Sequence, residues 1–117
     1  MSTPSIRIYH NTRCSKSREV LDLLKDYTTK IEVFEYLKTP PDYNTLKDLL
    51  MKLNLKPKDI IRTKEPLYKA KFENKKFNDE EWIQILVENP ALIERPIVVK
   101  GNRAIVARPP ELVHNLF

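Results

Sequence analysis

The residue in this sequence best placed to do chemistry is Cys14, which lies between a polar turn and the predicted start of a helix. The first N–H groups of a helix have no partner within the helix, so their partial positive charge favours a thiolate over a thiol. Arg13, Lys16 and Arg18 flank the cysteine, and the nearest acidic residue after it is Glu19. These residues predict a reactive cysteine that also attracts anions, rather than the small buried hydrophobe that a lone cysteine usually is.

Two neighbours bear on how this cysteine would work. His10 could share a proton with the thiolate or could be an ordinary hydrogen-bonding surface group, and its place in a turn favours the second reading. Ser17 stands where a C-x-x-C redox motif has its second sulfur, so the chain cannot resolve an oxidised Cys14 by itself. The chemistry therefore requires a thiol from outside.

Three more arginines are candidates for an oxyanion site. Arg95 precedes Pro96 at the start of a predicted strand, and Arg108 follows another predicted strand and precedes Pro109. Proline restricts the backbone at both places, which suits a binding role. Arg62 follows two apolar residues in the helical middle of the chain. Taken singly, each could be a surface arginine or a salt-bridge partner, but a guanidinium is a planar fork of donors that matches tetrahedral oxyanions.

The composition excludes several other classes of function. The chain has 117 residues, 41% of them hydrophobic and 32% charged, which indicates one folded domain. Its single glycine excludes the glycine-rich loops of P-loop and dinucleotide-binding folds. Its single cysteine excludes an internal disulfide and a multi-thiolate metal cage. No metal and no bound cofactor are expected.

The location and the macromolecular partners are expected from what the sequence lacks. Residues 1–7 contain no apolar signal region, and no stretch approaches the ~20 apolar residues that cross a bilayer. A cytoplasmic, reducing location without membrane association is expected. The net charge is +5, but the most basic stretch, 52–76, shows neither zinc-finger ligands nor an RNP-like motif. A pocket for a small anion is therefore expected, and nucleic-acid binding is not.

Hydrophobic periodicity predicts the elements that position these residues. A strand over 6–9 leads through a polar turn at 10–13 to a helix that begins at Ser15. A second strand is predicted over 31–36, and Thr39 is predicted to cap a helix whose first residue is Pro40.

The second half of the chain reads as a broken helical region followed by a hairpin. Asn78 with Glu81 predicts a capped helix that ends before Pro90, and residues 97–99 and 104–106 predict a hairpin turned at Gly101. A short helix follows at the C-terminus. This order predicts an α/β sandwich with a mixed sheet, in which the first two strands are parallel and the hairpin is antiparallel.

Four motifs give the chain a resemblance to a known family. They are the stretch 9–18, YHNTRCSKSR, which carries H-x-x-x-C-x-x-x-R, then Ile60-Ile61-Arg62, the stretch 94–99, ERPIVV, and Arg108-Pro109. In this order and spacing they resemble the ArsC family, the glutaredoxin-linked arsenate reductases of thioredoxin-like fold.

The resemblance implies an α/β fold, a thioredoxin-like three-layer sandwich with a small mixed β-sheet and an inserted helical segment. It implies one domain over 1–117, with the core at about 5–40 and 90–117, the insertion at about 41–89, and a cis peptide bond before Pro96. We expect a monomer.

The resemblance also implies the activity and the site. Cys14 would attack arsenate, Arg62, Arg95 and Arg108 would bind this substrate, and His10 and Arg18 would support the thiolate. Glutathione would be the cosubstrate and glutaredoxin the partner that releases arsenite.

Two other functions stay open. Some proteins similar to ArsC are housekeeping glutathione-dependent thiol reductases, and the motifs do not separate them from arsenate reductases. Spx-type transcriptional regulators, which bind RNA polymerase, resemble the family in length and fold. Those regulators typically carry C-x-x-C, so Ser17 favours the enzyme.

Overall fold

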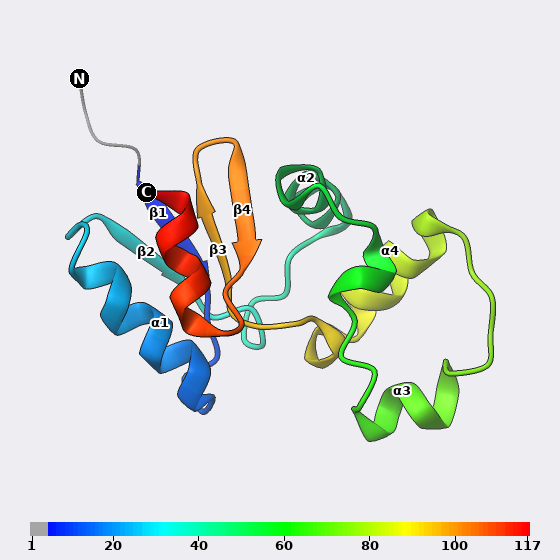
Figure 1. Cartoon of the computed structure of the whole chain (residues 1–117). Coiled ribbons are helices and arrows are strands. Elements are labelled where there is room, and N and C mark those ends of the chain that lie inside the picture. The colour runs from blue at the N-terminus through cyan, green and yellow to red at the C-terminus, as the bar shows by residue number, and fades with distance from the viewer. Residues whose placement is uncertain (1–4) are drawn as a thin grey trace. The chain divides into compact units, whose positions relative to one another are not determined.

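The computed structural model describes residues 5–117 (Figure 1). Residues 1–4, part of the segment that argued against a secretion signal, lie outside this range. Within residues 5–117, no helix has both the length and the apolar character needed to cross a membrane. The elements, in chain order, are β1 (Ile6–Tyr9), α1 (Ser15–Lys25), β2 (Ile31–Phe34), α2 (Tyr43–Leu53), the 3-10 helix η1 (Pro57–Ile60), α3 (Pro66–Lys71), α4 (Asp79–Glu88), the 3-10 helix η2 (Pro90–Leu92), β3 (Ile97–Lys100), β4 (Arg103–Val106) and the 3-10 helix η3 (Pro110–Leu116).

The four strands form one mixed sheet in the order β2-β1-β3-β4. β1 and β2 are parallel and are joined through α1, whereas β3 runs antiparallel to both β1 and β4. Both predicted strand relationships are thus confirmed, as is the α/β class. The register places Tyr9 opposite Ile97 and Ile97 opposite Val106. The C-terminal ends of β1 and β4 therefore meet the N-terminal end of β3 at one edge of the sheet.

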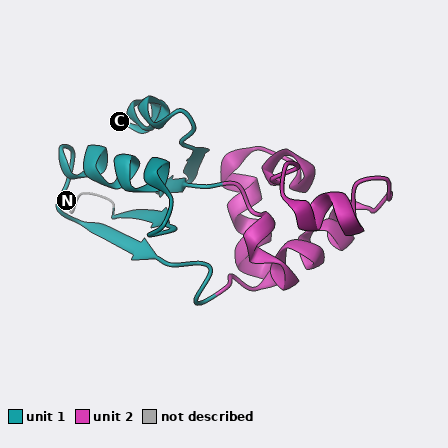
Figure 2. Cartoon of the chain, turned by 90° about the horizontal axis from the view of Figure 1, so that it is seen from below, with its two compact units in different colours: residues 1–39, 95–117 teal, residues 40–94 magenta. Residues whose placement is uncertain are grey.

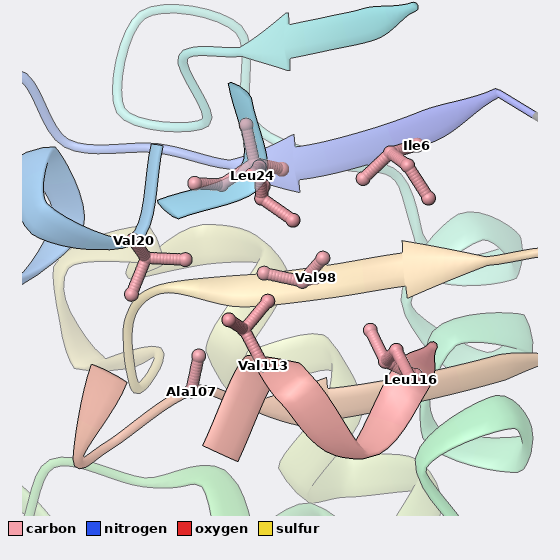
Figure 3. Packing of buried hydrophobic residues seen from close by; sticks show 8 residues of the cluster. Ile6, Val20, Leu24, Val98, Ala107, Val113 and Leu116 are labelled. Carbon is pink, nitrogen blue, oxygen red and sulfur yellow. The ribbon is translucent and has the colours of Figure 1, made fainter. Parts of the chain in front are cut away.

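One face of this sheet carries a core that α1 and η3 cover (Figure 3). Ile6 and Ile8 of β1 lie two residues apart, on the same face of the strand, and pack with Val98 of β3. α1 contributes Val20 and Leu24, which are one turn apart on the same helix face and are completely buried. This packing fixes the start of α1, and so Cys14, against the end of β1.

The chain divides into two compact units (Figure 2). Unit 1 comprises residues 1–39 and 95–117 and contains the whole sheet with α1 and η3. Unit 2 comprises residues 40–94 and contains α2, η1, α3, α4 and η2. It is closed by an isolated bridge between Ile61 and Ile93 and has its own buried residues, among them Leu46, Ile60, Trp82, Leu86 and Leu92.

Local sequence signals fixed most element ends. The capping box predicted for α4 is present, since Asn78 Oδ1 accepts from Glu81 N–H at 2.8 Å and Glu81 Oε1 accepts from Asn78 N–H at 3.0 Å. Gly101 has the expected positive φ, 60°, in the hairpin turn. The residues after Pro109 form a 3-10 helix.

Two predicted boundaries were wrong. α2 begins at Tyr43 and not at Pro40, and its cap is Asp42, whose carboxylate accepts from Thr45 N–H at 2.8 Å. Two consecutive prolines favour extended backbone, which delays the first turn until an Asp can cap it. β2 ends at Phe34, and Tyr36 lies in the following turn with its side chain buried.

Candidate functional site

The register of the sheet brings three predicted residues of unit 1 to the same edge. Cys14 follows β1, Arg95 precedes β3 by two residues, and Arg108 follows β4 by two residues. The two arginine segments are also tied together, because Ala107 N–H donates to Pro96 O at 2.9 Å. Both arginines are joined to the next proline by a cis peptide bond, which confirms the isomer expected before Pro96.

Cys14 is the N-cap residue of α1. Its backbone is extended, with φ −93° and ψ 120°, and its side chain is partly buried. Burial by itself raises the pKa of the thiol, but the N–H groups of Ser17 and Lys16 and the guanidinium of Arg95 favour the thiolate and bring the net pKa below its ordinary value. The predicted helix-terminus effect is therefore present, and Arg95 adds the charge that the loop cations were expected to supply.

Arg95 is held between the thiol and an aromatic side chain. Partial burial lowers its pKa, whereas Cys14 and the Tyr36 phenol raise it by charge and hydrogen bonding, and the net direction is upward. The guanidinium therefore stays charged beside the sulfur. Its Nε is shielded from solvent and has no hydrogen-bond partner among residues 5–117. A guanidinium in this position can also face an oxyanion bound at the sulfur.

His10 contacts Ser17 and not the sulfur. Its Nδ1 lies 2.6 Å from Ser17 Oγ, and the Ser17 hydroxyl also accepts from Asn11 N–H at 3.2 Å. The side chain is only 4% exposed, so the reading of His10 as a surface group was wrong. Burial, opposed by the charge of Glu35 and aided by that of Arg18, lowers the pKa of His10. His10 therefore contacts the residue whose N–H group helps to lower the pKa of Cys14.

The polar turn before Cys14 is braced by its own hydrogen bonds. Arg18 Nη1 donates to Thr12 O at 2.8 Å, and Asn11 accepts from Cys14 N–H through its carbonyl and from Arg13 N–H through its side chain, each at 3.0 Å. Arg18 therefore supports the loop backbone. The guanidinium of Arg13 is exposed and makes no ion pair with residues 5–117.

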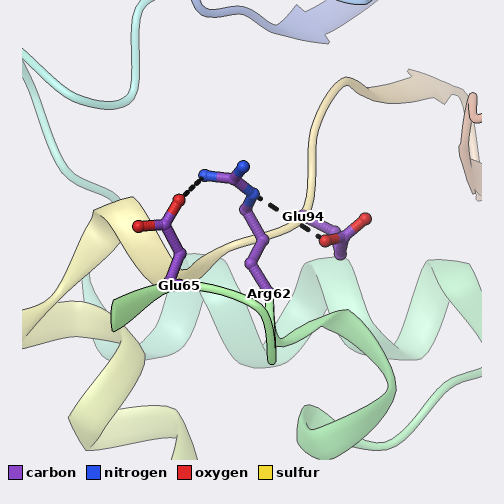
Figure 4. A network of polar contacts seen from close by, with 3 residues as sticks. All are labelled: Arg62, Glu65 and Glu94. Atoms are coloured by element: carbon purple, nitrogen blue, oxygen red, sulfur yellow. Dashed lines mark hydrogen bonds and ion pairs between the residues drawn. The ribbon is translucent and has the colours of Figure 1, made fainter. Parts of the chain in front are cut away.

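Arg62 belongs to unit 2 and is held by two carboxylates (Figure 4). Its Nη1 forms an ion pair with Glu65, and its Nε lies 3.9 Å from Glu94 Oε1. The backbone is anchored too, because Arg62 N–H donates to Leu92 O and Glu94 N–H donates to Ile60 O, each at 2.8 Å. Arg108 is exposed at the end of β4.

Three residues of these arrangements were missed at the sequence level. The prediction for Ser17 concerns only the missing second sulfur, although the third residue after an N-cap is where a backbone N–H comes near the capping side chain. Tyr36 and Glu65 carried no signal, because their roles depend on contacts with residues elsewhere in the chain. Among residues 5–117, no three His, Cys, Asp or Glu side chains gather where they could hold a metal ion.

The chemistry available in unit 1 is that of an activated nucleophile beside a fixed positive charge. A sulfur with a lowered pKa can attack an electrophilic centre, while Arg95 is placed to stabilise negative charge on that centre. Within residues 5–117 there is no second thiol to complete a redox pair.

Comparison with known proteins places this arrangement in a family. The chain is 48% identical over 113 residues to the uncharacterized protein YfgD of Escherichia coli, with 95% of each chain covered. It is 43% identical over 110 residues to an arsenate reductase of Neisseria meningitidis, with 92% of this chain and 94% of the relative covered. A solved arsenate reductase from Vibrio cholerae superposes with a TM-score of 0.92 at 40% identity, over 99% of this chain and 100% of that one.

The structural match confirms the thioredoxin-like α/β fold with a mixed four-stranded sheet. The model of the ArsC family matches residues 9–116, which include Cys14 and the three candidate arginines. The chain belongs to the ArsC family.

Proposed function

We propose that this protein is an arsenate reductase in which Cys14 is the nucleophile, glutathione the cosubstrate and glutaredoxin the partner that completes reduction. The observation that carries the proposal is the thiol of lowered pKa at the N-terminus of α1 beside Arg95. Relatives at 40–43% identity that are named arsenate reductases supply the substrate. The proposal includes a monomer in the cytoplasm, where glutathione keeps thiols reduced.

The first step forms a bond between sulfur and arsenic. The Cys14 thiolate attacks arsenate, an As–O bond breaks, and the oxygen leaves as water after taking up two protons. Arg95 and Arg108 offset the negative charge that builds up on the remaining oxygens. Arg62 is proposed as a third binding residue because of its motif, Ile60-Ile61-Arg62.

The two electrons come from two external thiols. Glutathione displaces a second oxygen as water and forms its own S–As bond. The glutaredoxin thiolate then attacks the glutathione sulfur, which becomes part of a mixed disulfide, while the electron pair of the broken S–As bond stays on arsenic. Water finally replaces Cys14 on the As(III), releasing arsenite and the thiolate. One thiol in the chain is enough because both oxidised sulfurs belong to the partners.

Replacement of Cys14 tests this mechanism directly. Cys14→Ser should abolish arsenate turnover coupled to glutathione and glutaredoxin, because a serine hydroxyl is not ionised at neutral pH. The measurement is the coupled rate, with circular dichroism to verify folding and Thr29→Ala, an exposed change in unit 1, as the control. Turnover near that of the parent protein in Cys14→Ser would refute the role of the sulfur.

The arginines can be tested against a matched arginine of the same sheet. Arg95→Ala, Arg108→Ala and Arg62→Ala should each slow turnover, since loss of one preorganised charge contact costs about 2–4 kcal/mol in the transition state. Arg103 is the control, because it pairs with Lys100 at the opposite end of the hairpin from Arg95 and Arg108. Unchanged kcat/KM for arsenate in all three variants would contradict the proposed oxyanion site.

A further inference from the structure

A cavity lies beside the catalytic loop, on the side of β2. Its volume is about 260 Å³. The residues that line it come from the turn after β1 and from the segment after β2, and all belong to unit 1. They are His10, Asn11, Thr12, Arg13, Glu35, Leu37 and Lys38. Cys14 directly follows the lining residue Arg13 in the chain. Its sulfur lies near Arg95, and the segment of Arg95 leads into β3, which neighbours β1 on the side opposite to β2.

The charges around the cavity have a distinct pattern of two cations and one anion. Arg13 is exposed and makes no ion pair with residues 5–117. Lys38 Nζ and Glu35 Oε1 lie 3.4 Å apart, with the lysine side chain 75% exposed and the glutamate 37% exposed. An ion pair this exposed to water is weak, so a ligand can compete for both of its members. The side chain of Leu37, 42% exposed, adds an apolar surface.

We propose that this cavity is the glutathione-binding site of the enzyme, called the glutathione seat below, an inference that rests on the proposed function. Glutathione carries two carboxylates and one ammonium group, the inverse of the charges on Arg13, Lys38 and Glu35. Its γ-glutamyl end holds an ammonium and a carboxylate on one carbon, which matches the adjacent Glu35 and Lys38. Its glycine carboxylate then pairs with Arg13. A second arsenate does not fit this pattern, because Glu35 repels a ligand that has only negative charge.

This arrangement puts the glutathione thiol next to the reacting sulfur. Arg13 precedes Cys14 in the chain, so a glycine carboxylate bound to Arg13 brings the neighbouring cysteinyl residue to the loop that carries Cys14. Arsenate held at Arg95 and glutathione held on the β2 side then approach Cys14 from different neighbours of β1, and the glutathione thiol reaches the arsenic once arsenic is bound to the sulfur. The seat therefore separates the binding of the two substrates.

The test compares glutathione with cysteinylglycine, which has the same thiol but lacks the γ-glutamyl group. Lys38→Glu should lower kcat/KM for glutathione about ten-fold, change kcat/KM for cysteinylglycine less than about two-fold, and leave KM for arsenate unchanged. The matched control is Lys30→Glu, a reversal at an exposed lysine of unit 1 that makes no ion pair with residues 5–117. Equal losses with the two thiols, or equal losses in the control, would overturn the seat.

A binding measurement separates this proposal from the proposed function. S-methylglutathione has no free thiol, so its binding does not depend on turnover. In a nuclear magnetic resonance titration it should shift the amide signals of residues 10–13 and 35–38, and it should do so more weakly in Lys38→Glu. If the protein does not reduce arsenate but shows these shifts, the proposed function is rejected and the glutathione seat is retained. Shifts located elsewhere, or none, would reject the seat even in an active enzyme.

Discussion

At the scale of single residues, the reactivity of Cys14 is shared between the helix and Arg95. The N–H groups of the first turn of α1 and the guanidinium of Arg95, two residues before β3, both favour the thiolate. Arg95→Ala should therefore raise the pKa of Cys14 toward the ordinary value of a thiol, about 8.5, because the charged form loses a partner. The pH dependence of alkylation by iodoacetamide measures this pKa, and Arg103→Ala is again the matched control.

The direction of the Cys14 pKa shift also predicts how the free energy of unfolding changes with pH. The folded-state pKa of Cys14 is below the ordinary value, so the contribution of the thiolate to folding is present above the ordinary pKa and is lost as the pH falls through the folded-state pKa. Alkylation of the parent protein with a midpoint at or above about 8.5 would contradict the whole electrostatic account.

The sequence predicts the position and the lowered pKa of Cys14 better than it predicts the residues around it. Cys14 could be recognised because a helix terminus and cationic neighbours are both local features. The contact between His10 and Ser17 could not be recognised, because it depends on how the folded chain buries both side chains. The contact between Arg95 and Cys14 depends on the register of β1 and β3, which no local pattern fixes.

At the scale of elements, the ends of the helices depend on single capping side chains. Asn78→Ala removes the acceptor for Glu81 N–H at the start of α4 and should lower the free energy of unfolding by about 1 kcal/mol. Urea unfolding measures the change. Asn74→Ala is a suitable control, since Asn74 is exposed in the preceding turn and makes no hydrogen bond through its side chain with residues 5–117. An equal loss in the control would show that the cap contributes nothing specific.

Element types were predictable where periodicity and capping agree. The alternation in β1, the apolar stripe of α1 and the box at Asn78 each fix a local structure without help from distant residues. The start of α2 was wrong because Thr39 and Asp42 are both acceptable caps, and the intervening prolines decide between them through backbone conformation.

At the scale of the whole molecule, unit 1 is built from two chain segments that flank unit 2 in the sequence. Leu24 lies in the unit 1 core and is fully buried, so Leu24→Ala should cost about 2–5 kcal/mol of stability. Leu112→Ala, at a leucine 37% exposed on η3, should cost much less. Circular dichroism in urea gives both values.

The only tryptophan, Trp82, is buried in unit 2 and reports on that unit alone. Chains of this length usually unfold in one cooperative transition, so fluorescence and circular dichroism should shift together in Leu24→Ala. Separate midpoints for the two signals would show that the units unfold independently. Local patterns in the sequence predicted the order of the elements. A core at about 5–40 and 90–117 with an insertion at about 41–89 was implied only by the family resemblance, because the compactness of a unit depends on contacts between distant segments.

The carboxylates around Arg62 have a consequence for any anion that this arginine meets. Glu65 and Glu94 restrict the guanidinium from two sides while its backbone is tied to Leu92, so most of its rotational freedom is already lost in the folded chain. An incoming anion encounters a donor whose orientation is set beforehand and whose charge is partly neutralised. If Arg62 binds an anion as proposed, that binding depends more on directional fit than on long-range attraction.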